Sequence, residues 1–256
     1  MFSFLSVFWS ARWYFLLGLL LLLVFLALTL PLHFAWPYVK PELGRLPVKV
    51  EQVTGSLWNG QLIGKHPQFG RLAMEWSLSP WSLMALEPEA DIEVENEQLH
   101  LEGVVSSTLD ANISVRSMSG FINVALLESS LKREKISAAG ELELSDFGLQ
   151  WSANERQVKN IGGRLVFSGG PASFPMGRKM TTVEVPLLVG QFGMKGTEAQ
   201  LVILSEDQTE LGTAVVKPDG WGSVAIRRRF IDAIGQKWPQ KASEDTIIFE
   251  VSRKIL

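Results

Sequence analysis

The chain of 256 residues contains no cysteine and only three histidines, and these shortages exclude several kinds of site. Without cysteine there is no disulfide, no thiolate metal site and no cysteine nucleophile. The histidines, His33, His66 and His100, do not occur at the spacing of a zinc protease, and no phosphate-binding glycine loop or serine-hydrolase elbow is present. We therefore predict no catalytic residue, no metal and no cofactor.

A strong charge of either sign is also missing, since the net charge is only −3. A nucleic-acid-binding protein would present a basic face, so we predict no nucleic-acid partner. The one tight basic cluster is Arg227-Arg228-Arg229. These arginines are either a solvated helix start or strand end, or a basic contact for phosphate head groups or an acidic partner.

A long apolar run is the strongest feature that the chain does have. It extends without a charge from Trp13 to Leu32, after Arg12. As a helix, these 20 residues would span roughly 30 Å, the hydrocarbon thickness of a bilayer. The length of the run and the lack of a small-x-small cleavage site at its end favour an uncleaved anchor over a signal peptide. A buried soluble helix is disfavoured because no face of the run is polar.

The apolar run divides the chain into four predicted parts. These are a short cytoplasmic head (1–12), a transmembrane anchor (13–32), a linker (33–47) and a β-rich domain (48–256). Basic residues on both sides of the run leave the orientation open. A short head before a large domain favours a signal anchor that exports its C-terminal domain. We therefore expect a single-pass protein of a bacterial inner membrane, in contact with the lipid bilayer, with its domain in the periplasm.

Short alternating runs broken by Gly, Pro, Asn and Asp fill the predicted domain. This pattern predicts a mainly β fold, an antiparallel, curled meander with a few short helices. In the clearest hairpin, a turn at Asn96–Glu97 would place Val94 opposite Leu99 and Ile92 opposite Leu101. We predict further hairpin turns at Ser145–Asp146 and Gly190–Gln191, and a turn over Lys217–Trp221, where proline, aspartate and glycine follow one another.

Other segments extend this prediction of strands and helices. Pro186 should lie at a sheet edge or bulge, because proline has no backbone N–H to donate a hydrogen bond to a neighbouring strand. Predicted helices are 79–86, with Ser79 as a cap and Pro80 first, then 123–135 and 228–235. One face of such a sheet must be covered by its own curl, a second sheet, a partner or lipid. The further strands are 48–53, 62–65, 72–78, 113–115, 120–124, 164–168, 200–204, 213–217, 223–227 and 246–252.

The most distinctive segment is Val53-Thr54-Gly55-Ser56-Leu57-Trp58-Asn59-Gly60, near the start of the domain. One interpretation is a glycine turn or bulge that packs Trp58 into the core. The other is a recognition edge close to the membrane. On the second interpretation, Gly55, Leu57, Trp58 and Gly60 are the candidate interaction motif.

The chain resembles the type II secretion system protein N family. The segment 53–60 has the form V-x-G-[ST]-[LVI]-W-x-G, and it follows an N-terminal anchor and precedes a cysteine-free β-rich domain. The segment Trp76–Leu83 is similar to a W-x-L-x-P-x-x-L pattern of that family and of AsmA-type envelope proteins. The resemblance implies an accessory inner-membrane subunit that helps to export folded proteins through contacts with other secretion subunits. It implies no cofactor and no catalytic residue.

Two other functions stay open. An AsmA-like periplasmic carrier or scaffold would hold lipid or another apolar ligand in a groove formed by the apolar face of the meander. An anchored envelope hydrolase would need a cleft with a cluster of titratable groups, and the sequence nominates no residues for one.

Overall fold

The computed structural model describes residues 13–23, 25, 26, 32, 48–133, 135–176, 179–238 and 241–255. Residues 13–23, 25 and 26 are helical. Within the described residues, no helix combines the length and the apolar character needed to cross a membrane. The predicted head, the linker and part of the predicted anchor lie outside the described residues.

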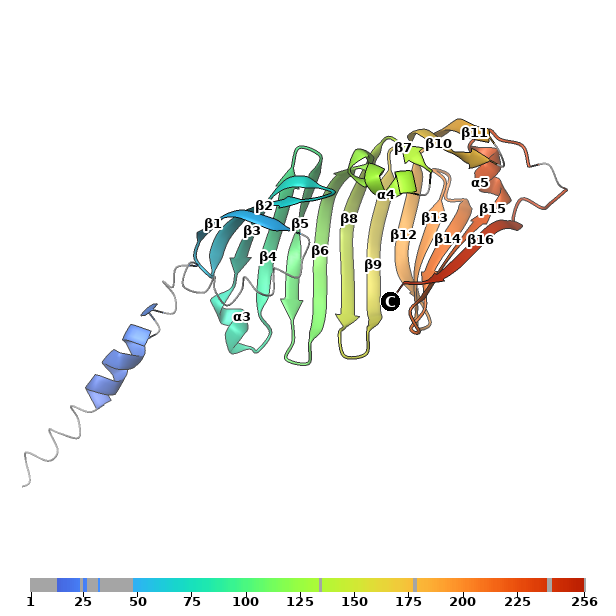
Figure 1. The fold of residues 1–256 in the computed structure, drawn as a ribbon. Helices are drawn as coiled ribbons and strands as arrows, with labels where there is room; N and C mark the ends of the chain where they lie inside the picture. The colour runs from blue at the N-terminus through green and yellow to red at the C-terminus, as the bar shows by residue number, and fades with distance from the viewer. Residues whose placement is uncertain are drawn as a thin grey trace, which may run out of the picture.

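Thirteen strands form one large antiparallel sheet, and neighbours in the chain are mostly neighbours in the sheet (Figure 1). This confirms the predicted mainly β, antiparallel fold, and each of the ten further predicted strand segments overlaps an observed strand. The strands, in sheet order, are β1 (Lys49–Gly55), β2 (Asn59–His66), β3 (Gly70–Leu78), β4 (Glu89–Asn96), β5 (Leu99–Ser107), β6 (Asn112–Asn123), β8 (Glu141–Ser152), β9 (Gln157–Phe167), β12 (Leu188–Lys195), β13 (Glu198–Leu204), β14 (Glu210–Val216), β15 (Trp221–Arg227) and β16 (Ile247–Lys254).

In the described residues after position 47, a second, three-stranded sheet and four short helices accompany the large sheet. The small sheet has the order β11-β10-β7, from β11 (Lys179–Val185), β10 (Gly170–Met176) and β7 (Ser137–Ala138). The helices are α3 (Pro80–Met84), the 3-10 helix η1 (Val124–Leu127), α4 (Glu128–Arg133) and α5 (Arg228–Ala233). In Figure 1, the small sheet, α4 and α5 gather at one end of the long strands, and α3 lies at the opposite end.

The register creates a continuous apolar surface on one side of the large sheet, which we call the apolar face. Directly paired residues of antiparallel strands point to the same side. One row of such residues crosses all thirteen strands, and every member is apolar or glycine: Val53, Leu62, Met74, Val94, Leu101, Gly120, Leu144, Leu165, Gly190, Ile203, Gly212, Ile226 and Phe249. The opposite side, the polar face, carries the row Thr54, Gln61, Glu75, Glu93, Glu102 and Ser119.

The buried core is small and lies toward the end that holds the small sheet and α5. Its apolar side chains include Leu99 of β5, Val124 of η1, Val183 of β11 and Leu211 of β14. Of the described apolar side chains in β1 to β4, none is buried. The described helices also contact the large sheet only locally, α5 beside β14 and β15, and η1 beside β6. Much of the apolar face is therefore only half-buried.

The hairpin predicted at 91–101 is present, but its turn lies one residue later than predicted. Val94 pairs with Leu101 rather than with Leu99, so the predicted register is wrong by two residues. A shift of two keeps every side chain on its predicted face. The reason lies in Asn96, whose Oδ1 accepts a hydrogen bond from the Gln98 amide at 2.8 Å and whose Nδ2 donates to the Phe69 carbonyl at 3.0 Å. Asn96 thus starts the turn.

The turns predicted at Ser145–Asp146 and Gly190–Gln191 are wrong, because both pairs lie inside long strands. In β8, the register with β9 shifts after Ser145 and Asp146 has φ 49°, which marks a bulge. In β12, a Cβ on Gly190 would lie 2.9 Å from Cδ1 of Leu201 on the neighbouring strand. Gly190 therefore leaves space for the Leu201 side chain of the neighbouring strand and does not form a turn.

The remaining local predictions are confirmed with two corrections. The turn at Lys217–Trp221 forms, with Gly220 at φ 83° and the Trp221 amide donating to Oδ1 of Asp219 at 3.1 Å. All three predicted helices are present, as α3, as η1 with α4, and as α5. However, the Ser79 side chain makes no capping bond. Pro186 lies in the short connection between β11 and β12, outside any strand, so the predicted edge or bulge position is wrong.

Candidate functional site

The predicted interaction motif forms the tight turn between β1, an edge strand, and β2. The Ser56 hydroxyl accepts hydrogen bonds from the amides of Trp58 and Asn59, at 3.2 and 3.1 Å. The Ser56 amide in turn donates to the Asn59 carbonyl at 2.8 Å. Gly55, with φ 94°, and Gly60 flank this turn, and Leu57 and Trp58 are half-buried within it. The structure thus brings all four predicted motif residues together at one corner of the sheet.

The second distinctive sequence segment packs directly against this turn. The indole Nε1 of Trp76 donates to the Leu57 carbonyl at 3.0 Å. The Leu78 amide donates to the Trp58 carbonyl at 2.6 Å. The segments 53–60 and 76–83, which resemble the same family, are therefore parts of a single structural unit that includes the β1–β2 turn, β3 and the start of α3.

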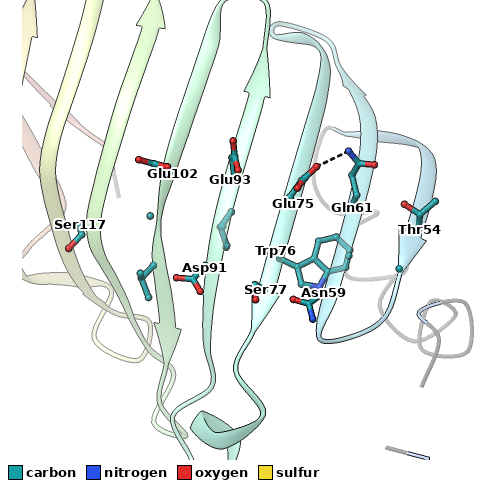
Figure 2. Close-up of a pocket in the computed structure, with 15 residues that line it drawn as sticks. Thr54, Asn59, Gln61, Glu75, Trp76, Ser77, Asp91, Glu93, Glu102 and Ser117 are labelled. Carbon is teal, nitrogen blue, oxygen red and sulfur yellow. Dashed lines mark hydrogen bonds between the residues drawn. The ribbon is translucent and has the colours of Figure 1, made fainter. Parts of the chain in front are cut away.

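A shallow hollow of about 650 Å³ lies on the polar face beside this turn (Figure 2). Across it, Glu75, Glu93 and Glu102 stand side by side on β3, β4 and β5, each directly paired with the next. Gln61 donates to one oxygen of Glu75 at 2.9 Å. Like charges in direct cross-strand pairs repel one another. The hollow is therefore a region of negative potential, suited to a cationic or hydrogen-bond-donating partner.

A neighbouring group on the polar face was not foreseen as a unit from the sequence. Glu93, Glu95 and His100 bring three potential metal-ligand atoms within 4.8 Å of one another. Nδ1 of His100 lies 3.7 Å from Oε1 of Glu93. The sequence signal for this group was the alternation that places its residues on the same solvent-exposed face of one hairpin. The corrected register of that hairpin places Glu95 opposite His100. The three side chains are at least partly exposed to solvent, and sheet alternation alone accounts for their position.

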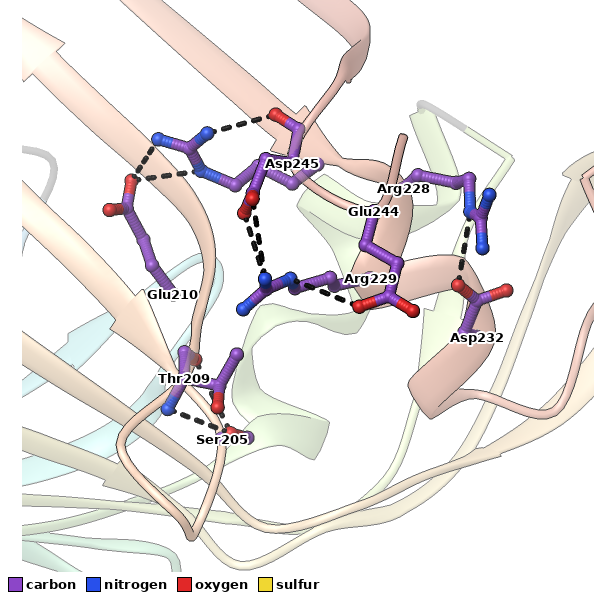
Figure 3. A network of polar contacts seen from close by, with 9 residues as sticks. Ser205, Thr209, Glu210, Arg228, Arg229, Asp232, Glu244 and Asp245 are labelled. Carbon is purple, nitrogen blue, oxygen red and sulfur yellow. Dashed lines mark hydrogen bonds and ion pairs between the residues drawn. The ribbon is translucent and has the colours of Figure 1, made fainter. Parts of the chain in front are cut away.

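The predicted basic contact lies far along the chain, at the start of α5, and its charges are paired internally (Figure 3). Arg227 donates to Oε1 of Glu210 through Nε at 3.1 Å and Nη2 at 2.8 Å. Arg228 pairs with Asp232 at 3.2 Å. Arg229 pairs with Asp245 at 3.1 Å and lies 3.7 Å from Glu244. The cluster holds the loop before β16 against α5 and β14, and contact with an outside partner stays a prediction.

These features define the class of the protein: an open, antiparallel β-sheet protein with one apolar and one polar face. A family model described as "Type II secretion system (T2SS), protein N" matches residues 47–229, which run from the start of β1 beyond the end of β15. The match covers most of the chain, so the chain belongs to the type II secretion system protein N family, as the sequence resemblance predicted. No curated protein and no solved structure matches the chain.

Proposed function

We propose that this chain is an accessory inner-membrane subunit of the type II secretion pathway, with its sheet in the periplasm, and that it acts through protein contacts rather than catalysis. The observation that carries the proposal is the family match over nearly the whole large sheet. The N-terminal apolar run supports the membrane location, and the mild net charge is compatible with a protein partner.

The two edges of the large sheet offer a physical means for such contacts. Within the part of the chain that the structure describes, β1 and β16 each pair with a strand on one side only. Their free amides and carbonyls are suited to hydrogen bonding with an added strand of a partner, and pockets beside the edge would supply specificity. The β1–β2 turn, with Leu57 and Trp58, adjoins the first of these edges, and for this reason we retain it as the interaction motif.

In-cell photocrosslinking tests this proposal. A photoreactive amino acid in place of Trp58 should capture another secretion subunit in a strain that actively exports a type II substrate. The same amino acid in place of Asp207, in the exposed β13–β14 turn at the other end of the strands, should capture none and serves as the control. Deletion of the gene should leave exported proteins in the periplasm. Intact export together with no capture from position 58 would contradict the proposal.

A carrier or scaffold for lipid or another apolar ligand is the second candidate, favoured by the apolar row across all thirteen strands. A curl of the sheet about this face would form a groove for such a ligand. Native mass spectrometry of the full chain, released from lipid-free amphipol, should reveal a co-purifying small molecule. Its complete absence from protein isolated under mild conditions would eliminate the carrier.

A further inference from the structure

The last strand of the large sheet, β16, leaves a long open edge. Within the described part of the chain it pairs with β15 alone, and seven of its eight residues are exposed. From Phe249 to Lys254 its register is unbroken, and the strand contains no proline. The opposite edge strand, β1, has a bulge between Val50 and Gln52. Proteins commonly protect sheet edges with bulges, prolines or short strands, so an edge without these features is suited to pairing with another chain.

Two hydrogen bonds show which backbone groups of β16 point to this open edge. The Ile255 amide donates to the Gly220 carbonyl at 2.8 Å, so this amide faces β15. The Trp221 carbonyl accepts the Lys217 amide at 2.8 Å, so it faces β14 and makes no bond to its partner on β16. In an antiparallel ladder these directions alternate from one residue to the next. The residues of β16 whose amides and carbonyls point outward are therefore Glu250, Ser252 and Lys254.

The side chains of β16 divide between the two faces of the sheet. Phe249 belongs to the apolar row, and alternation places Val251 and Ile255 on the same face. These three side chains are 57%, 47% and 47% exposed, in that order. Glu250 and Lys254 point to the polar face, and within the described residues neither of them forms an ion pair. The open edge thus carries exposed apolar groups on one face and two unpaired, opposite charges on the other.

We propose that β16 pairs in antiparallel fashion with β16 of a second copy of this chain, about a two-fold axis at Ser252. Glu250 of each copy then lies opposite Lys254 of the other copy, on the polar face. Phe249 of each copy lies opposite Ile255 of the other, on the apolar face. Three outward-facing pairs that exchange two bonds each give about six backbone hydrogen bonds. The free backbone groups and both charges of β16 therefore find their partners in an identical strand.

The charges select this register among the possible two-fold arrangements. Outward backbone groups must meet outward backbone groups, so the axis has to pass through a residue of β16. An axis at Glu250 or at Arg253 would place two like charges directly opposite each other, which is unfavourable. An axis at Val251 would leave Glu250 and Lys254 without an oppositely charged partner. Of these four positions, Ser252 alone gives two ion pairs and no direct repulsion.

The same complementarity identifies the partner as a second copy. A strand of another protein would have to match β16, whereas β16 carries both members of the ion pair and so matches itself. A two-fold contact between identical strands also closes at two copies and builds no fibre. The inference goes beyond the secretion role, because it assigns the β16 edge to self-association and leaves β1 and the turn at 53–60 for other subunits. The axis is perpendicular to the sheet, so two chains held in one bilayer would turn a sheet face toward the membrane.

Disulfide crosslinking of the full chain in isolated membranes tests the contact. The chain contains no cysteine, so each engineered cysteine reports only its own position. Ser252→Cys should form a covalent dimer on oxidation, because opposed Cα atoms about 5.5 Å apart suit a disulfide. Ser223→Cys is the matched control, since Ser223 pairs with Ser252 one strand further in, and its two copies would lie about 14 Å apart. We expect at least ten-fold more dimer from position 252, and Asp207→Cys in an exposed turn measures random collision.

Mixed cysteine variants test the register. When copies that carry Glu250→Cys are co-expressed with differently tagged copies that carry Lys254→Cys, a disulfide should join the two tags. Neither variant should crosslink to itself, because its two cysteines would lie about 14 Å apart along the paired strands.

Charge reversal in the Ser252→Cys background tests the ion pairs. Glu250→Lys or Lys254→Glu alone places like charges opposite each other twice, and each should reduce the yield of covalent dimer at least three-fold. The double variant restores both ion pairs with their signs exchanged, and its yield should return to within two-fold of the parent. Circular dichroism melts confirm that each variant is folded, and rescue by the double variant cannot arise from misfolding.

Several results would overturn the proposal. Equal dimer yields from positions 252 and 223, self-crosslinking of Glu250→Cys, or a double variant no better than the single ones would each do so. Capture from position 58 and export of secreted proteins are measured in the cysteine-free chain, so failure here is distinguishable from failure of the secretion role.

Discussion

The indole ring of Trp76 occupies the space in which a side chain on Gly60 would begin. The two residues are cross-strand partners in β2 and β3, and a Cβ on Gly60 would fall 2.2 Å from Cζ2 of Trp76. The ring cannot simply swing away, because its Nε1 is hydrogen-bonded to the Leu57 carbonyl. The second glycine of the motif is therefore required by packing, whatever else the turn does.

We predict that Gly60→Ala destabilises the protein by overpacking this contact. The free energy of unfolding should fall by about 1–3 kcal/mol, the usual cost of a methyl forced into a packed site. Gly193→Ala is the matched control, since Gly193 also lies in a strand but has no heavy atom within 4 Å of an added Cβ. Urea denaturation followed by tryptophan fluorescence measures both. Equal effects of the two substitutions would contradict this account of the motif.

The row of carboxylates on the polar face predicts a stabilising substitution. Glu93 lies directly between Glu75 and Glu102, so Glu93→Gln removes two repulsive cross-strand pairs. The free energy of unfolding at neutral pH should rise by about 0.2–1 kcal/mol, and more at low than at high salt. Glu250→Gln, whose cross-strand partner is Ala225, should change little. A loss of stability in Glu93→Gln, independent of salt, would show that repulsion does not dominate there.

The Arg227–Glu210 pair should matter more than the surface ion pairs. Its side chains are 28% and 38% exposed, and two guanidinium nitrogens of Arg227 contact the same carboxylate oxygen. Glu210→Ala leaves a largely buried guanidinium without its carboxylate, which should cost about 1 kcal/mol. Glu51→Ala, which breaks a pair with the 69% exposed Arg71, should cost about 0.3 kcal/mol or less. Chemical denaturation of the two variants compares these costs, and equal losses would refute the ranking.

Glu155 should titrate below the ordinary value of 4.5, because a side-chain hydrogen bond from Lys159 lowers its pKa. Since the pKa is depressed on folding, the associated stabilisation is present above pH 4.5 and is lost as the pH falls through the folded-state pKa. We predict that Lys159→Gln raises the Glu155 pKa toward 4.5, as measured by carboxyl-carbon NMR titration. An unchanged pKa in that variant would exclude Lys159 as the main cause.

The sequence predicted elements well where the pattern was local. Lys217–Trp221 forms its turn because the proline, the aspartate and the glycine each act on neighbouring backbone. The faces of β4 and β5 follow from alternation alone. The prediction failed where a residue's role depended on another strand. Gly190 resembles a turn residue in the sequence, and only the structure shows that Leu201 of the neighbouring strand occupies the space beside it. Asp146 forms no turn because its strand, β8, pairs with β6 on one side and with β9 on the other.

The candidate sites divide in the same way. The motif 53–60 was found from its glycines and tryptophan, but its contact with Trp76 required the pairing of β2 with β3. The arginines 227–229 stood out as a basic cluster, yet their carboxylate partners come from a different strand and from the loop before β16. The sequence shows how many charged residues a segment has, but whether each charge is paired depends on which side chains lie close together in the folded protein.

By itself, the sequence determined that this chain builds antiparallel strands with one apolar side, that it lacks thiol chemistry, and that it resembles its secretion family. Alternation is a pattern of neighbouring residues and composition is a sum over the chain, so both can be read without a structure. Only the tertiary structure decided that thirteen strands align their apolar residues into one row, and that the arginines 227–229 meet carboxylates from β14 and from the loop before β16. Those results depend on register, and register is set by hydrogen bonds between residues far apart in the chain.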